Sequence, residues 1–235
     1  MSEWTTVAVL GAHGKTGRAV SAALAARGAG VVGLGRSQWP RLVSVVAGCD
    51  AAYLIAPNLH PDEPAYVAAA LDALRAAGVP RVVYHSVAAP YAPDLPHHLG
   101  KAVAEDLVRR SGLAWTVLQP GAYLQNLDLT SGRPLTVSYR LDAPFGFLDL
   151  ADLAAAAATV LLEPGHVGAT YELASVASTV GELTAAAGVV ATVVPYAESP
   201  ALSERENAWL AAMFAYYDRY GLPVGTRTLG ALLGR

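Results

Sequence analysis

VAVLGAHGKTGR, residues 7–18, is the stretch that decides the fold. A short run of β-branched and small apolar residues ends at Gly11, and two more glycines follow at three-residue spacing, Gly14 and Gly17. An alanine-rich pattern with the period of an α-helix begins directly after them. The stretch therefore predicts a strand, a tight glycine turn, and a helix whose first backbone N–H groups point at whatever binds on the turn.

The start of this helix favours an anionic ligand. It offers unsatisfied N–H donors and the positive end of the helix dipole, which together suit a pyrophosphate. The spacing G-x-x-G-x-x-G is a variant of the dinucleotide-binding fingerprint. An ATPase phosphate loop ending at Gly14-Lys15-Thr16 is excluded, because it requires a glycine where Val9 stands. An ordinary glycine-rich turn is the remaining alternative.

Composition bounds the class of protein. A length of 235 residues suits one α/β domain or one domain with a small appendage, and 54% hydrophobic and 15% charged residues predict a globular protein rather than a disordered one. The net charge of −3 gives no electrostatic case for nucleic acid. Cys49 is the single cysteine, so an internal disulfide is excluded. The N-terminal MSEWTT lacks a signal-peptide pattern and the apolar run 153–162 is too short for a bilayer, so we expect a soluble cytoplasmic protein.

Strand and helix patterns alternate along the first half of the chain. Strands are predicted at about 5–10, 31–34, 51–56, 81–86 and 114–118, and helices at 15–27, 40–47, 61–77 and 97–111. This alternation predicts a doubly wound parallel sheet of the Rossmann type. The second half is less regular, with helices at about 149–162, 179–187 and 202–220 and short strands at 135–139, 169–173 and 189–194. We expect one domain over 1–235, with a cofactor half at about 1–120 and substrate-cap elements at about 121–148 and 165–235.

The carboxyl ends of the predicted strands should line one crevice, where ligands of this fold bind. The second of these ends carries Arg36 and Ser37 with no acidic residue beside them. An acidic residue at this position hydrogen-bonds to the ribose 2′-hydroxyl of NAD, whereas arginine pairs with the 2′-phosphate of NADP. The pair therefore favours NADP, the alternative being an ordinary exposed arginine at a strand end.

Lys101 and His97 are the candidate catalytic residues. They lie four residues apart at the start of a predicted helix, where short-chain dehydrogenases have Y-x-x-x-K, so histidine replaces the tyrosine. Lys101 would hold the nicotinamide ribose, and His97 or His98 would be a general acid with a pKa near neutrality. The alternative is that all three are surface groups. Two histidines without a third ligand predict no metal site.

Several motifs together resemble the NmrA-like family of atypical short-chain dehydrogenases and reductases. They are GAHGKTGR, GRS, APN, VYHSVA, HHLGKAVAEDLVRRSGLAWTVLQPGAYLQN and FGFLDLADLAAAAATVLLEP, within about 7–173. The resemblance implies a Rossmann NAD(P)-binding domain with a small substrate cap. Members include NADPH-dependent quinone reductases, isoflavone-reductase relatives and regulators that sense NADP without turnover.

The resemblance also implies the residues of the site. Pyrophosphate would be held by Gly11, His13, Gly14, Lys15, Thr16 and Gly17, and the adenosine phosphate by Arg36 and Ser37. The nicotinamide end would be lined by Ala56, Pro57, Asn58, Ser86, Lys101, Pro120, Gly121, Ala122 and Tyr123.

The chain departs from the family pattern in two places. Almost nothing separates Gly35 from the helix predicted at Pro40, where the family has a helix, a short strand and an acidic loop. We therefore expect the sheet to lack an edge strand and the adenine pocket to be shallow. The chain is also shorter at its end, which implies a smaller cap and a more open substrate site.

We expect an NADPH-dependent oxidoreductase that transfers hydride to a quinone, enone or carbonyl compound. The substrate pocket should be apolar and aromatic, with Tyr91, Tyr123, Phe145 and Phe147 as candidate lining residues. The alternatives are a non-catalytic NADP(H) sensor that presents a surface to a partner protein, and a redox-neutral isomerase, epimerase or cyclase. The long helix at 202–220 could pack on its own chain or form a homodimer.

Overall fold

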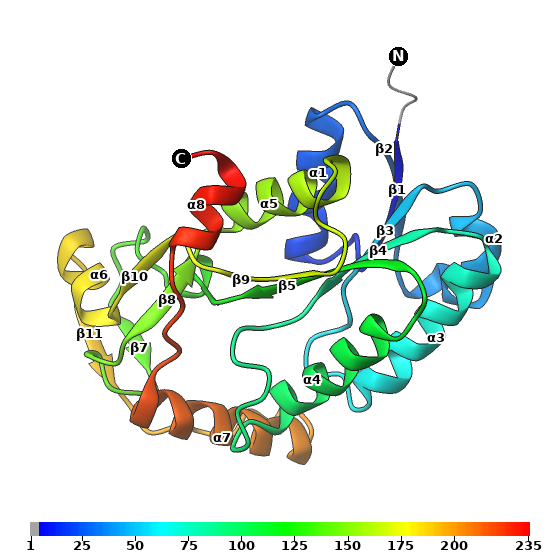
Figure 1. Cartoon of the computed structure of the whole chain (residues 1–235). Helices are drawn as coiled ribbons and strands as arrows, with labels where there is room; N and C mark the ends of the chain where they lie inside the picture. The colour runs from blue at the N-terminus through cyan, green and yellow to red at the C-terminus, as the bar shows by residue number, and fades with distance from the viewer. Residues whose placement is uncertain (1–4) are drawn as a thin grey trace.

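A six-stranded parallel sheet forms the centre of the computed structural model, which describes residues 5–235 (Figure 1). Its order is β2-β1-β3-β4-β5-β9. The strands are β1 (Thr6–Leu10), β2 (Gly30–Leu34), β3 (Ala51–Leu54), β4 (Arg81–His85), β5 (Ala114–Pro120) and β9 (Ala169–Leu173). The predicted doubly wound Rossmann architecture is confirmed. The first residues of MSEWTT, on which the signal-peptide expectation rests, lie outside the described residues.

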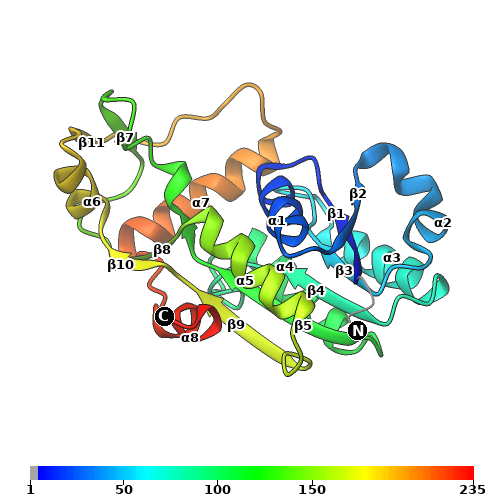
Figure 2. The ribbon, with the colours of Figure 1, turned by 90° about the horizontal axis from the view of Figure 1, so that it is seen from above.

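Helices cover both faces of this sheet (Figure 2). The helices α1 (Lys15–Ala26) and α5 (Leu150–Leu162) pack on one face, and α2 (Leu42–Val46), α3 (Glu63–Ala76) and α4 (Pro96–Arg109) on the other. Alternate residues of β1 enter the two cores, Val7 and Val9 on the first side and Ala8 and Leu10 on the second. Burial on both faces explains why the strands are almost wholly apolar.

Among residues 5–235 the sheet ends at β2, which confirms the expected loss of an edge strand. The chain passes from β2 directly into a 3₁₀ helix, η1 (Arg36–Arg41), and then into α2. The helix predicted at 40–47 therefore begins later, at Leu42. Trp39 of η1 stacks on Tyr66 of α3 with ring centroids 4.3 Å apart, which anchors this short connection to the neighbouring helix.

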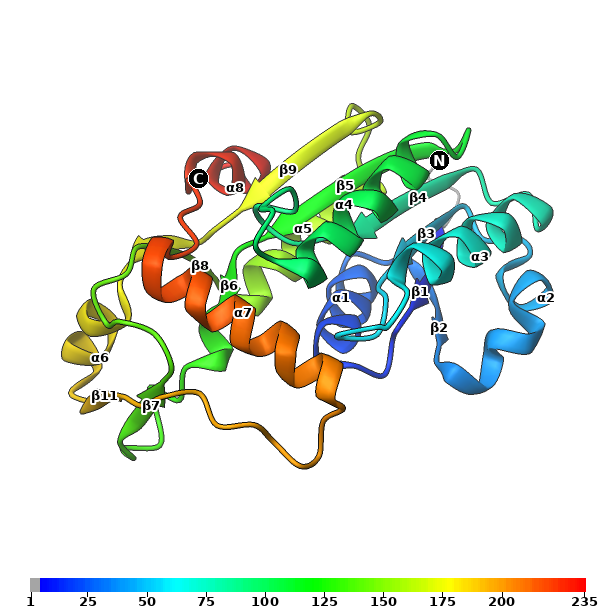
Figure 3. The ribbon, with the colours of Figure 1, turned by 90° about the horizontal axis from the view of Figure 1, so that it is seen from below.

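The cap lies beyond the carboxyl ends of the strands (Figure 3). It contains β6 (Ala122–Tyr123), η2 (Leu124–Asn126), β7 (Leu135–Val137), β8 (Phe145–Leu148), β10 (Val176–Ser178), α6 (Val180–Ala187), β11 (Ala191–Val193) and α7 (Glu204–Tyr220). The strands β10, β8 and β6 form one small sheet, and β11 pairs with β7. The helix α7 packs into the cap core through Met213, Phe214 and Tyr217 and reaches α4 through Trp209.

The strand β9 pairs with β5, and α8 (Arg227–Leu233) returns to the main core through Leu229, so these elements belong to the central layer. In the part of the chain that the structure describes, 5–235, no helix has the length and apolar character needed to cross a bilayer.

Candidate cofactor and substrate site

The glycine turn between β1 and α1 is tightly packed. Gly11 has φ +90°, a conformation that favours glycine, and its N–H and that of Ala12 donate to the carbonyl of Leu34. A Cβ on Gly17 would lie 2.2 Å from the Gly11 carbonyl oxygen. The helix therefore starts directly against the turn, as close approach to a pyrophosphate requires.

The first turn of α1 carries no side-chain cap. Its N-cap residue is Gly14, and the turn contains no acidic residue. By contrast, α3, α5, α6 and α7 are capped by the side chains of Asp62, Asp149, Thr179 and Ser203. The uncapped start of α1 leaves backbone donors and the dipole available to an anion. This geometry fits the pyrophosphate of a dinucleotide.

The residues expected at the adenosine end lie where β2 ends. Arg36 and Ser37 are exposed at the start of η1. The Ser37 hydroxyl donates to Gln38 Oε1, which also accepts the Gly35 N–H. His13 packs over Gly35 so closely that a Cβ there would lie 2.4 Å from its ring. Arg36 and His13 thus border the same end of the glycine turn.

The cap reaches the glycine turn through η2 and Tyr123. Lys15 Nζ lies 3.2 Å from Asn126 Oδ1 and 5.4 Å from the centre of the Tyr123 ring. Thr16 Oγ1 donates to the Tyr123 hydroxyl at 3.5 Å. Pro120 and Gly121 are buried beneath this contact, and a Cβ on Gly121 would collide with the carbonyl of Gly146. Ala122 is half-buried in β6 beside them.

Behind Tyr123 lies a buried polar chain that sequence reasoning did not assign a role. Each nitrogen of the His85 ring makes one hydrogen bond: Nδ1 lies 2.8 Å from the Tyr53 hydroxyl and Nε2 lies 3.2 Å from the Tyr123 hydroxyl. The only sign in the sequence that His85 could belong to the site was its position at the end of a predicted strand. Its partners come from β3 and β6, which are distant in sequence.

Lys101 is buried and ion-paired. Its ammonium lies 2.8 Å from Glu63 Oε1, which also accepts the Tyr84 hydroxyl at 2.6 Å. The other oxygen, Glu63 Oε2, is buried without a hydrogen-bond partner. Glu63 is a second residue that the sequence pattern did not single out. In this structure Lys101 is thus directed to α3.

His97 and His98 are neutral in this structure. Burial, followed by the charge of Lys101, lowers the pKa of His97 from 6.5 to about 3, and burial lowers that of His98 to about 4. The expectation of a pKa near neutrality is therefore corrected, because desolvation disfavours the charged ring. His97 stacks on Trp209 of α7 with centroids 5.8 Å apart, at the boundary between α4 and the cap.

The other predicted site residues differ in their burial and in their partners. The Ser86 hydroxyl donates to the fully buried Glu105, and Gln119 donates to the same oxygen. Tyr91 is 62% exposed and accepts from Arg109 on the outer side of α4. Phe145 and Phe147 are buried in the cap core. Ala56, Pro57 and Asn58 follow β3, and only Asn58 is exposed.

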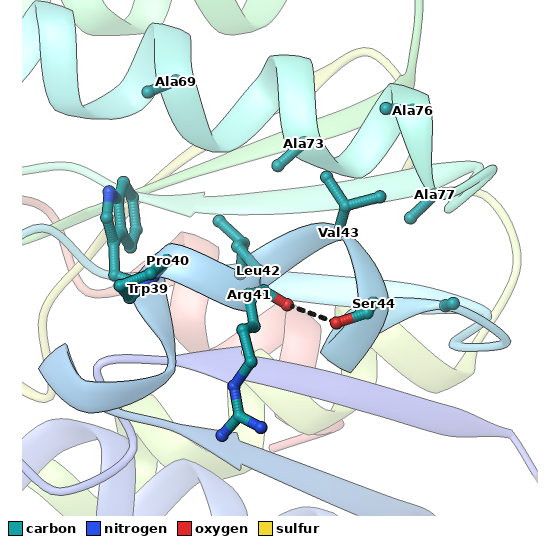
Figure 4. Close-up of a pocket in the computed structure, with 11 residues that line it drawn as sticks. Trp39, Pro40, Arg41, Leu42, Val43, Ser44, Ala69, Ala73, Ala76 and Ala77 are labelled. Carbon is teal, nitrogen blue, oxygen red and sulfur yellow. Dashed lines mark hydrogen bonds between the residues drawn. The ribbon is translucent and has the colours of Figure 1, made fainter.

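An apolar groove of about 590 Å³ lies elsewhere, between the short segment after β2 and α3 (Figure 4). Ala69, Ala73 and Ala76 of α3 and its C-cap residue Ala77 face the stretch from Trp39 to Ser44, and Ala47 completes the lining. None of the predicted site residues lines this groove.

Residues 38–164 match the NAD(P)H-binding family, and the chain belongs to this family. It is 33% identical over 159 residues to the NAD(P)H azoreductase of Xenophilus azovorans, an alignment covering 63% of this chain and 54% of the azoreductase. The chain thus spans about half the length of that relative.

Two structures of an NADPH-dependent quinone oxidoreductase from Escherichia coli share the fold. The NADPH complex has a TM-score of 0.80 at 24% identity, covering 97% of this chain and 95% of that chain. The other structure has a TM-score of 0.76 at 26% identity, covering 97% of this chain and 94% of that chain. The negative transcriptional regulator NmrA has a TM-score of 0.80 at 18% identity, covering 99% of this chain and 92% of that chain. The expected resemblance is thus confirmed in family and fold: the chain belongs to the NAD(P)H-binding family and shares its fold with NmrA and the quinone oxidoreductase.

Proposed function

We propose that this chain is an NADPH-dependent reductase acting on a small apolar or aromatic acceptor such as a quinone, enone or carbonyl compound. The observation that carries the proposal is the uncapped start of α1 on the glycine turn, with Tyr123 and His85 directly beside it. The azoreductase and the quinone oxidoreductase support it by their names.

The cofactor would be held by its phosphates. Backbone N–H groups of Lys15, Thr16 and Gly17 would bind the pyrophosphate, and Arg36 with Ser37 the adenosine 2′-phosphate. Bound NADPH would supply the hydride, and the chain supplies position and electrostatics. Lys101, held by Glu63, places positive charge near the carboxyl end of β4, where it favours the anionic oxygen of a reduced acceptor.

Of the four aromatic residues expected in the substrate pocket, Tyr123 lies nearest the glycine turn. Phe145 and Phe147 support the cap from within, and Tyr91 lies outside it. We therefore propose that the acceptor binds beside Tyr123, where the cap meets the glycine turn.

A non-catalytic NADP(H) sensor is the second candidate. The ion pair between Lys101 and Glu63 favours the sensor, because the ammonium of Lys101 is then not available to bind the nicotinamide ribose. The fold shared with the NmrA regulator is compatible with it.

Cofactor titration followed by an acceptor panel separates these functions. We expect NADPH to raise the melting temperature more than NADH, and the absorbance of NADPH to fall when a quinone, enone or azo dye is added. Tight NADPH binding without oxidation by any acceptor would overturn the reductase and favour the sensor. Absence of NADPH binding would overturn both.

A further inference from the structure

Tyr53, His85 and Tyr123 form a continuous chain of hydrogen bonds that leads from the buried core to the half-buried Tyr123. Tyr53 is fully buried and His85 is 7% exposed. Each ring nitrogen of His85 faces one phenol, Tyr53 at 2.8 Å and Tyr123 at 3.2 Å. Tyr123 in turn contacts Thr16 on the glycine turn. The chain therefore connects the centre of the sheet with the proposed cofactor site.

The chemistry of a neutral imidazole fixes the direction of these hydrogen bonds. Burial, and then the charge of Lys101, lowers the pKa of His85 to about 3, so the ring is neutral and has one donor and one acceptor nitrogen. If Tyr53 accepted from Nδ1–H, its own proton would be left in the core without an acceptor among residues 5–235. A buried unsatisfied donor is costly, so Tyr53 donates to Nδ1.

The other nitrogen must then be the donor. His85 Nε2–H points at the Tyr123 oxygen, which also accepts the Thr16 hydroxyl, so the Tyr123 proton points away from both of these groups. The ammonium of Lys15 lies over the Tyr123 ring, 5.4 Å from its centre. This charge and the neutral Nε2–H donor of His85 stabilise negative charge on the Tyr123 oxygen.

We propose that His85 is a positioning residue that holds Tyr123 as the proton donor to an oxygen of the acceptor. This inference rests on the proposed reductase function. The acceptor gains two electrons and one hydrogen as hydride from NADPH, which becomes NADP⁺. The O–H bond of Tyr123 breaks, a new O–H bond forms on the acceptor, and the phenolate accepts the hydrogen bond of Nε2–H until water reprotonates it.

Nitrogen-15 NMR of the histidine-labelled full chain tests the arrangement without turnover. We expect the Nε2–H tautomer for His85, unchanged between pH 5 and pH 8. Tyr53→Phe should abolish this tautomer preference while the protein stays folded. A predominant Nδ1–H tautomer, or a ring that gains a proton near pH 6.5, would overturn the inference.

Kinetics with NADPH and 1,4-naphthoquinone test the role of the phenol. Tyr123→Phe should lower kcat about 100-fold, the usual contribution of a general acid, with NADPH affinity retained. His85→Leu should lower kcat as well, and His85→Gln should recover part of it because its amide can donate in place of Nε2–H. Tyr171→Phe is the matched control, since that phenol pairs with His166 at 2.9 Å, away from the site.

A wild-type kcat in Tyr123→Phe would overturn the inference while the reductase function stands. A wild-type protein that binds NADPH but reduces no acceptor would overturn the proposed function, and the proton transfer with it.

Discussion

Gly17 lies so close to the preceding turn that a side chain there must displace backbone. A Cβ would lie 2.2 Å from Gly11 O and 2.7 Å from the Ala12 Cα. We expect Gly17→Ala to destabilise the protein by about 1–3 kcal/mol, the usual range for overpacking, and to abolish NADPH binding. Urea unfolding and calorimetric titration measure the two effects.

Gly100→Ala is the control for that substitution. Gly100 lies inside α4, and a Cβ there meets nothing within 4 Å. Alanine should stabilise the helix by about 0.5–1 kcal/mol. Equal stability changes in the two variants would contradict the packing described for the turn.

The Glu63–Lys101 pair is a buried ion pair with side-chain exposures of 2% and 10%. Glu63→Gln leaves the ammonium uncompensated, and we expect a loss of roughly 3 kcal/mol in unfolding free energy, near the lower end for breaking a buried pair. Asp106→Asn removes an exposed pair with Arg110 and should change stability by less than about 1 kcal/mol. Similar losses from both substitutions would contradict a buried pair.

At the scale of elements, the start of α1 decides binding. Gly14 has extended dihedrals, φ −73° and ψ 167°, and space for a Cβ. Gly14→Asp should cap the helix and stabilise the free protein by up to about 1 kcal/mol. Its carboxylate should abolish NADPH binding by repelling the pyrophosphate.

Gly14→Ala distinguishes the effect of the carboxylate charge from the effect of the added side-chain volume. Alanine adds the Cβ without the carboxylate, so it should retain most of the NADPH affinity measured by calorimetry. If Gly14→Asp bound NADPH as tightly as the wild type, the pyrophosphate would not lie at this helix.

The elements of the main sheet could be predicted because each carries its own periodic signal. β1, β3 and β4 are buried on both faces and read as continuous apolar runs. β8, β10 and α8 were missed. β8 has only four residues and includes Gly146, and β10 has three. The two strands are stabilised by pairing with each other across the cap, and α8 by packing of Leu229 on the main core, rather than by a local pattern.

The candidate site was less predictable than the fold. The glycine turn follows from local sequence, but the partners of Lys101 and His85 come from other elements. Glu63 lies on α3, and Tyr53 and Tyr123 belong to β3 and β6. Only the assembled sheet shows that these side chains meet. Likewise, the neutrality of His97 depends on burial that its place near a helix start does not reveal.

At the scale of the whole molecule, buried histidines make stability depend on pH. His85 and His98 have ordinary pKa values of 6.5 when unfolded, and burial lowers them to about 3 and 4 in the folded chain. The unfolded state therefore binds more protons within this window. Their contribution is fully present above pH 6.5 and is lost as the pH falls, by at most about 1.4 kcal/mol per pH unit for each ring.

Guanidinium unfolding at several pH values between 7.5 and 5.5 measures how the free energy of unfolding changes with pH. This range lies above the pH at which ordinary carboxylates titrate. His98→Asn should reduce the slope by about one proton. A flat profile over this range would mean that the rings titrate with the same pKa in the folded and unfolded states, and would contradict their burial as neutral groups.

Transfer of hydride from bound NADPH tests the central claim most directly. The full chain, loaded with NADPH deuterated on one or the other face of the nicotinamide ring, is mixed rapidly with 1,4-naphthoquinone while NADPH absorbance is followed. We predict oxidation that is slower with deuterium on one face only, because the protein fixes the ring relative to the acceptor. The central claim would be contradicted if NADPH were shown to be bound and its absorbance did not fall. It would also be contradicted if, in a single turnover limited by the chemical step, deuterium on neither face slowed the oxidation.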